Sequence, residues 1–220
     1  MSSYPSDAQA KSEILEAGLK LYERGLVAAN DGNLSVRVGE NALWVTPTGV
    51  SKGYMTEDML VKIVLDGNRL EGTHVPSSET KMHLRIYKED PLVRAVVHAH
   101  PPVATAFAAA GIPLDRPILQ EAVVQLGTVP VAPFALPGSQ GVADSVAPYC
   151  KTCRALLLEY HGAVAWGDSM KQAHYRMECL EQVAKVMLHM RTLGCDRVMP
   201  NSLVKDLESL RPSWGIRQLS

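Results

Sequence analysis

Apolar and polar positions along the first third of the chain follow two different periods. Over residues 8–25, apolar side chains recur at three- and four-residue spacing, which predicts an amphipathic helix that ends at Gly25. Residues 34–38 alternate between apolar and polar, which is typical of a strand, and Ala42–Val45 is predicted to be its hairpin partner. A further strand is predicted at 61–65. This part of the chain therefore predicts a helix followed by antiparallel strands.

The rest of the chain also contains both the helical and the strand pattern. Between residues 113 and 148, short apolar runs alternate with proline and glycine, which predicts strands joined by tight turns. The tail from Asn201 is polar and weakly helical. The other predicted elements are a helix capped by Ser77 or Ser78, a strand at 95–100, a helix at 103–110, strands at 154–160 and 163–166, and a helix at 169–193. No repeat or linker divides the pattern, so we expect one domain over residues 1–220.

Composition narrows the class of protein. The chain has 220 residues, of which 46% are apolar and 20% are charged, and these values are typical of a soluble globular protein. Its net charge of −1 predicts neither a nucleic acid nor a membrane as partner. It has no apolar run of membrane-spanning length and no apolar signal region, so we expect a cytoplasmic location. The four cysteines show no zinc-ribbon spacing and are interpreted as incidental reduced thiols.

The strongest chemical signal is His98-Ala99-His100 at the end of a predicted strand. Because side chains alternate along a strand, His98 and His100 project from one face, and the two prolines that follow end the pairing. Neutral imidazole is the commonest ligand for divalent transition metals, so this pair indicates a metal site. The exposed polar face of an edge strand is the alternative. A third histidine, His161, also stands at a predicted strand end.

Two further stretches have the composition of an anion site. Residues 46–53 are rich in hydroxyls and glycine and carry Lys52, so they can wrap a phosphate with the lysine as counter-charge. The same composition is common in simple turns. Ser77 and Ser78 stand at a predicted helix start, where backbone N–H groups also favour an anion. A phosphate site is therefore a hypothesis that rests on two segments far apart in the chain.

Glu79 follows the two serines and has two interpretations. A carboxylate in the first turn of a helix complements the helix dipole, which is a structural role only. The other interpretation makes Glu79 a fourth metal ligand or an acid/base group. His83, four residues further on, shares the face of Glu79, and we interpret it as a packing residue.

Together these motifs resemble the class II aldolase/adducin family, with the greatest likeness to the fuculose-1-phosphate aldolase branch and related sugar-1-phosphate aldolases. The likeness runs over residues 8–194, and the motifs occur in the order of the family. They are Gly32-Asn33-Leu34-Ser35, Thr46-Pro47-Thr48-Gly49, Pro76-Ser77-Ser78-Glu79, His98-Ala99-His100 and His161-Gly162.

The resemblance implies a fold, an assembly and a site. The implied fold is a single-domain three-layer α/β/α structure with a mainly antiparallel central sheet, assembled as a homotetramer with sites at subunit interfaces. The implied metal ligands are His98, His100, His161 and Glu79, which hold one divalent cation per subunit, in most members Zn²⁺, with Mn²⁺ or Co²⁺ as alternatives. Glu79 is also the implied acid/base. The implied phosphate-binding residues are Gly32, Asn33, Thr48, Gly49, Ser77 and Ser78.

The implied activity is a metal-dependent aldolase. It would reversibly cleave a ketose 1-phosphate of the fuculose, ribulose or deoxy- or methylthio-pentulose type into dihydroxyacetone phosphate and an aldehyde. A metal-dependent decarboxylase or a sugar-phosphate 4-epimerase on the same site are alternatives. The epimerases carry Ser-Ser-Asp where this chain has Ser77-Ser78-Glu79, whereas the decarboxylases are not distinguished by the motifs. A non-enzymatic adducin-like scaffold is disfavoured because the three histidines and Glu79 are all present.

Two positions depart from the fuculose-phosphate enzymes. Those enzymes have tyrosines, used for proton transfer and aldehyde recognition, where this chain has Gln120 and Trp214. This difference argues against fuculose as the substrate. Gln120 and Glu121 are retained as possible substrate contacts, with Glu121 or a bound water as the substitute proton donor.

Overall fold

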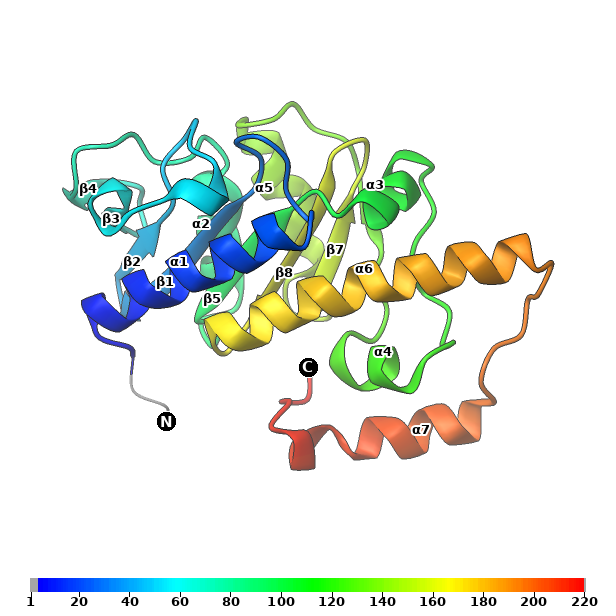
Figure 1. The fold of residues 1–220 in the computed structure, drawn as a ribbon. Coiled ribbons are helices and arrows are strands. Elements are labelled where there is room, and N and C mark those ends of the chain that lie inside the picture. The colour runs from blue at the N-terminus through cyan, green and yellow to red at the C-terminus, as the bar shows by residue number, and fades with distance from the viewer. Residues whose placement is uncertain (1–3, 220) are drawn as a thin grey trace.

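The computed structural model describes residues 4–219 and is built around one sheet (Figure 1). Its eight strands follow the order β4-β3-β2-β1-β5-β8-β7-β6, and β6 and β7 form the parallel pair in an otherwise antiparallel sheet. The strands are β1 (Asn33–Gly39), β2 (Ala42–Val45), β3 (Val61–Val64), β4 (Arg69–Glu71), β5 (Ala95–Ala99), β6 (Val131–Ala132), β7 (Ala155–Leu158) and β8 (Gly162–Gly167). The expected mainly antiparallel sheet is confirmed.

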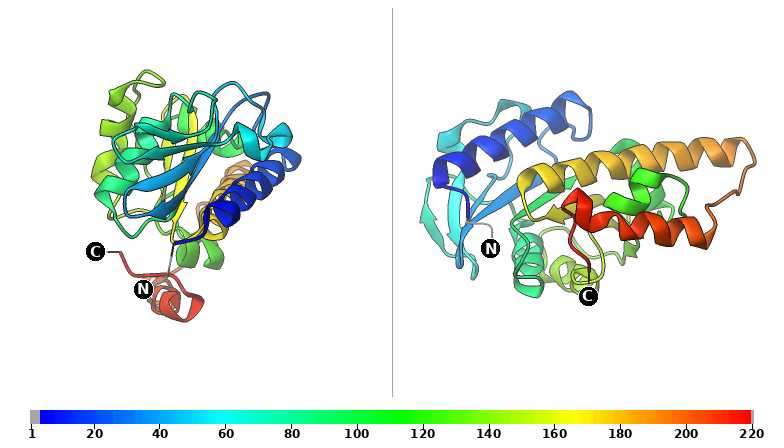
Figure 2. Two further views of the ribbon diagram at one scale, coloured as in Figure 1. Left: turned by 90° about the vertical axis from the view of Figure 1, so that its left-hand side faces the viewer. Right: turned by 90° about the horizontal axis from the view of Figure 1, so that it is seen from below.

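Helices cover both faces of the sheet, which gives three layers (Figure 2). On one face α1, α3 and α6 pack over a hydrophobic cluster that includes Leu34 and Val97, and on the other α2 and α5 pack over a cluster that includes Val96 and Trp166. The helices are α1 (Asp7–Glu23), α2 (Thr80–Glu89), α3 (Pro102–Ala109), α4 (Gln120–Gln125), α5 (Gln140–Val146), α6 (Met170–Thr192) and α7 (Asn201–Ser209). The predicted α/β fold class is confirmed.

The ends of the two long helices follow from local chemistry. The Ser6 side chain accepts a hydrogen bond from the Gln9 N–H at the start of α1, and the chain leaves that helix at Gly25, whose φ is +66°. The Ser169 side chain caps α6 in the same way by accepting from the Gln172 N–H. Both helices are therefore fixed by residues that the sequence places at their ends.

Two sequence predictions about local structure are wrong. Residues 113–148 contain only two strand residues, Val131–Ala132, and otherwise form α4, α5 and loops. Their apolar runs are short, and a run of that length suits the buried side of a short helix as well as a strand. Neither Ser77 nor Ser78 caps α2: Glu79 is its N-cap residue and makes no side-chain cap bond, because a turn from the Ser77 carbonyl to the Thr80 N–H precedes the helix.

The strand that carries the histidine pair lies near the middle of the sheet. β5 pairs with β1 on one side, where Asn33 lies opposite His98, and with β8 on the other, where Val164 lies opposite His98. Val97 and Ala99 point into the α1 and α6 layer, so Val96 and His98 point toward α2. The fold thereby aims the histidine at the start of α2. Within residues 4–219, no helix combines the length and apolar character needed to cross a membrane.

Candidate metal and phosphate site

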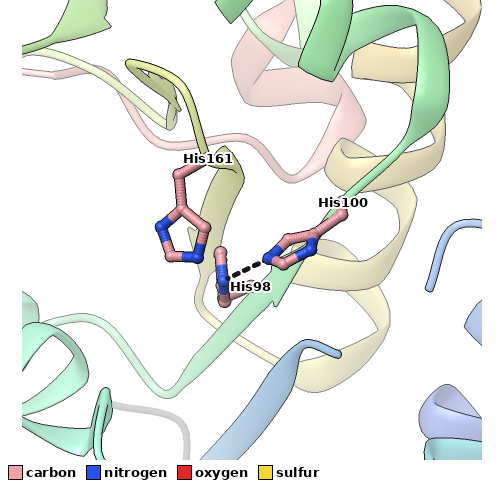
Figure 3. A group of neighbouring side chains, drawn as sticks. All are labelled: His98, His100 and His161. Atoms are coloured by element: carbon pink, nitrogen blue, oxygen red, sulfur yellow. Dashed lines mark hydrogen bonds between the residues drawn. The ribbon is translucent and has the colours of Figure 1, made fainter. Parts of the chain in front are cut away.

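Three histidines from two separate parts of the sheet face one another (Figure 3). His98 lies on β5, His100 follows the end of β5, and His161 lies in the turn between β7 and β8. One ring nitrogen from each lies within 4.8 Å of the others, and the Nε2 atoms of His98 and His100 are 3.1 Å apart. His98 is fully buried, while His100 and His161 are about one fifth exposed. The cluster therefore opens to solvent on one side.

The second nitrogen of two of these rings is held by an acceptor. The Nδ1 of His98 lies 2.9 Å from the Ala163 carbonyl oxygen, and the Nδ1 of His100 lies 3.2 Å from Asp31 Oδ2. In a neutral ring, such a contact favours the tautomer with the proton on Nδ1, which leaves Nε2 to bind a cation. Burial, and after it the neighbouring His98 and His161, lower the pKa of His100 to about 4. The ring is therefore neutral near pH 7.

Glu79 completes the cluster from the start of α2. Its Oε2 lies 3.2 Å from His98 Nε2 and accepts a 2.8 Å hydrogen bond from Asn33 Nδ2, and its Oε1 lies 3.3 Å from His161 Nε2. Burial opposes ionisation of this carboxyl, but His98, His161 and Asn33 outweigh it and hold the pKa of Glu79 well below its ordinary value. The carboxylate is therefore charged at neutral pH.

A divalent cation fits this donor set. Three imidazole nitrogens converge, and two of them, the Nε2 atoms of His98 and His100, approach to 3.1 Å, an arrangement that can hold a cation. Glu79 Oε1 is buried and makes no hydrogen bond within residues 4–219. Three histidines with one carboxylate are ligands of the type that zinc and related cations prefer.

A cavity of about 310 Å³ adjoins the cluster. Two loops form its wall because the chain pairs them: Pro47 and Pro76 form a β-bridge, and the Thr48 N–H donates to the Val75 carbonyl. The lining residues are Asn30, Asp31, Gly32, Asn33, Pro47, Thr48, Gly49, Ser77, Ser78, Glu79, His100, Pro137 and His161. The six residues predicted to hold a phosphate therefore all line one cavity beside the histidines.

Glycine is required at two of the motif positions. Gly32 has a φ of +74°, and a Cβ there would lie 2.7 Å from the His98 carbonyl oxygen. A Cβ on Gly162 would lie 2.6 Å from both the Ala99 carbonyl oxygen and His100 Cδ2. Both glycines thus allow the backbone to pack against the strand that carries the histidines.

Lys52 is not in the cavity, although the sequence suggested it as the counter-charge of a phosphate. It is only 2% exposed, and its Nζ donates to the carbonyl oxygens of Asn30 (3.1 Å) and Val50 (2.5 Å). Because its stem is covered by the N-terminal helix layer, the ammonium reaches backbone carbonyls behind the cavity wall rather than the cavity. Lys52 therefore joins two loops of the site.

Gln120 and Glu121 are also apart from the histidines within one chain. Both are exposed at the start of α4, and Glu121 lines a different groove together with Glu178 and Cys179 of α6. Sequence reasoning also missed Asp31, whose carboxylate contacts His100 and lines the cavity. The signal in the sequence that could have identified Asp31 is its position next to Gly32, the first residue of a motif.

The buried ammonium of Lys52 predicts a pH dependence of stability. Burial lowers the pKa of Lys52 to about 8, although the charges of Asp31 and Glu79 oppose this shift. Between pH 8 and about 10.5 the unfolded chain holds a proton that the folded chain has lost, so the free energy of unfolding rises with pH in this window. From pH 8 to 10 we expect a contribution of about 2 kcal/mol.

Urea unfolding at pH 7, 8, 9 and 10 measures this contribution. We expect Lys52→Met to flatten the curve relative to the wild type, and Lys81→Met, at an exposed lysine, to leave its shape unchanged. Parallel curves for the wild type and Lys52→Met would contradict the assignment.

Known proteins share this sequence and fold. The family model described as the class II aldolase and adducin N-terminal domain matches residues 12–188. A 3-oxo-tetronate 4-phosphate decarboxylase from Haemophilus influenzae is 34% identical and covers 93% of this chain and 98% of its own. An L-fuculose phosphate aldolase from Methanococcus maripaludis is 33% identical, over 83% of this chain and 98% of its own. The solved structure of an L-fuculose 1-phosphate aldolase superimposes with a TM-score of 0.86 at 30% identity, over 95% of this chain and 98% of its own.

Proposed function

The chain belongs to the class II aldolase and adducin family, and from this premise we propose that it is a metal-dependent lyase that decarboxylates a 3-oxo sugar acid phosphate. The substrate class is that of 3-oxo-tetronate 4-phosphate, the compound in the name of one relative. The observation that carries the proposal is the junction of the three histidines and Glu79 with a cavity lined by hydroxyls and glycines. The histidines and Glu79 suit a cation, and the hydroxyls and glycines of the cavity suit an anion.

The reaction needs few groups. The bond between C1 and C2 breaks, its electron pair forms an enediolate across C2 and C3, and CO₂ leaves. Addition of one proton at C2 then gives dihydroxyacetone phosphate, so the substrate and one proton become this product and CO₂. A divalent cation, when bound by His98, His100 and His161, would supply a Lewis acid for the two oxygens of the enediolate.

The protein residues have separate tasks in this scheme. Thr48, Ser77 and Ser78 would bind the phosphate, so that remote binding energy positions the reacting bond. Glu79, at 3.2 Å from His98, is placed to accept a proton from solvent and deliver it to C2.

The departure at the tyrosine positions favours decarboxylation. An aldol cleavage must remove a proton from the hydroxyl of the leaving aldehyde, whereas a carboxylate leaves as CO₂ without such a step. This chain has Gln120 and Trp214 where the fuculose-phosphate enzymes have tyrosines, and no tyrosine lines the described cavity. Decarboxylation needs no base for an aldehyde proton, so it is consistent with the absence of these tyrosines.

The aldolase is the second candidate. Cleavage of a ketose 1-phosphate forms the same enediolate of dihydroxyacetone phosphate, so the metal and phosphate residues serve both reactions. The likeness to fuculose phosphate aldolases supports it. We further propose Zn²⁺ as the cation and a homotetramer with sites at subunit interfaces, while the cytoplasmic location stays a prediction.

An assay of the two reactions side by side tests the proposal. The metal-loaded protein is incubated with 3-oxo-tetronate 4-phosphate and, separately, with a panel of ketose 1-phosphates. We expect CO₂ and dihydroxyacetone phosphate in equal amounts from the first, and little product from the second. Faster cleavage of a ketose 1-phosphate would refute the proposed decarboxylase activity and support the aldolase activity.

The phosphate site gives a separate prediction. Removing the hydroxyls with Thr48→Ala and Ser77→Ala weakens binding of a group remote from the reacting bond, so KM is expected to rise more than kcat falls. Inorganic phosphate should compete with the substrate. The control is Thr192→Ala at the end of α6. Equal activity on the substrate without its phosphate would count against the site.

A further inference from the structure

A row of three buried polar side chains runs along one side of α2. Glu79, His83 and Tyr87 follow one another at four-residue spacing, and His83 and Tyr87 are each 1% exposed. Each contacts a polar group of β1. Asn33 Nδ2 donates to Glu79 at 2.8 Å, and Ser35 Oγ lies 2.7 Å from His83 Nδ1.

Tyr87 closes the row at its far end. Its hydroxyl donates to the Ser35 carbonyl oxygen at 3.1 Å and lies 2.8 Å from Ser35 Oγ. The surroundings are otherwise apolar, with Met82, Ile86 and Val96 in the same hydrophobic cluster. Polar groups in such a place are held firmly, because no water competes for their hydrogen bonds.

The spacing of side chains along β1 matches the spacing along α2, so the contacts between the two elements repeat. Asn33 and Ser35 are two residues apart on one face of β1, a separation of about 6.7 Å. Glu79 and His83 are four residues apart on α2, a rise of about 6 Å. The Asn33–Glu79 and Ser35–His83 contacts are therefore two matched cross-links between the same strand and the same helix end.

The second cross-link fixes a helix end that has no cap of its own. The first turn of α2 begins at Glu79 without a side-chain cap bond. Asn33 is the hydrogen-bond donor from β1 that holds the carboxylate, and a helix anchored one turn further on also sets the height and the rotation of the Glu79 backbone. Burial, and after it His98, lower the pKa of His83 to about 3, so its ring is neutral and acts here through its hydrogen bond.

We propose that His83, held by Ser35, which Tyr87 holds in turn, is a positioning residue that locks α2 onto β1 and so keeps the Glu79 carboxylate between His98 and His161. Its effect passes through Glu79, whose role as proton carrier and metal neighbour rests on the proposed function. No described hydrogen bond joins the His83 ring to His98 or His161, so the hydrogen bonds of the row reach the cluster through the Glu79 carboxylate.

A double-mutant cycle on Zn²⁺ affinity tests this without reference to turnover. Zn²⁺ alone is titrated into the apo forms of the wild type, Ser35→Ala, Tyr87→Phe and Glu79→Gln, and of the two double variants with Glu79→Gln. We expect Ser35→Ala and Tyr87→Phe to weaken Zn²⁺ binding by roughly tenfold when Glu79 is present, as removal of an outer partner does. In the Glu79→Gln background the same changes should have no effect.

A proton-exchange measurement gives a second readout. Exchange of the C3 proton of dihydroxyacetone phosphate with solvent deuterium should slow by about tenfold in Ser35→Ala and Tyr87→Phe. His83→Asn, which retains a polar nitrogen near the Nδ1 position, should exchange faster than His83→Leu. Trp44→Phe is the matched control, because it removes one hydrogen bond, to Asp7, from an equally buried aromatic ring on β2.

The outcomes separate the inference from the proposed function. Additive effects on Zn²⁺ affinity in the cycle, or wild-type exchange in folded Tyr87→Phe, would overturn the positioning role. An equal loss of exchange in Trp44→Phe would also overturn it, since the effect would then be one of general stability. A wild type that binds Zn²⁺ with the expected coupling but releases no CO₂ would leave the positioning role supported and refute the decarboxylase.

Discussion

Replacing His98 by alanine is expected to remove the metal and the activity together. His98 is the fully buried histidine of the cluster and the proposed central ligand, with Nε2 close to His100 and Glu79. A Lewis acid at a developing enediolate contributes several kcal/mol, so the loss of activity should reach at least about 10³-fold. Metal analysis of the purified variant and its turnover are the two measurements.

Chelation offers the same test without a substitution. Removal of the metal from the wild type should abolish activity, and added Zn²⁺ should restore it in the wild type but not in His98→Ala. His189→Ala, at an exposed histidine in the last turn of α6, is the control and should change neither quantity. One metal per chain in a variant with both His98 and His100 replaced would show that the ligands lie elsewhere.

The second large effect is expected from Glu79→Gln. The amide keeps the size of the side chain but cannot carry a proton, while His98, His100 and His161 still hold the cation. Acid/base groups contribute typically 10²–10⁴-fold, and the rate of C3 proton exchange in dihydroxyacetone phosphate should fall by about that factor. Metal content at saturating Zn²⁺ should stay at the wild-type level.

Glu121→Gln distinguishes the alternative proton carrier. Glu121 lies on α4, away from the histidines of its own chain, so its replacement should leave exchange unchanged. If Glu121→Gln lost exchange and Glu79→Gln retained it, the acid/base role would pass to Glu121, and Glu79 would be a ligand only.

Sequence reasoning could predict the parts of the site that depend on local geometry. The alternation of side chains along β5 was enough to place His98 and His100 on one face, and the contact of their Nε2 atoms agrees with it. Composition suggested an anion site at Thr48 and at Ser77, but the addition of Gly32 and the grouping of all three in one site followed from the resemblance to a family, since no local pattern relates loops so far apart.

The errors have physical causes as well. A lysine in a loop is normally solvated, so the burial of Lys52 against two carbonyls could not be inferred from its neighbours in sequence. Ala122–Val124 is too short for its period to separate a strand from α4. His83 was interpreted as a packing residue because a lone histidine on a helix is more often packed than a ligand, and its burial agrees with this. Its contact with Ser35 could not be inferred, because Ser35 lies 48 residues away on a strand whose position against α2 no local pattern reveals.

Because β5 has hydrogen-bonded neighbours on both sides, the histidines it carries can be inherited unchanged while the substrate changes. An interior strand tolerates few insertions, since every one would break two ladders. Residues 47–49 and 77–78 of the cavity wall belong to no strand of the sheet and lie outside that constraint. Substitutions in these loops can therefore alter the fit of the substrate without displacing the histidines of β5.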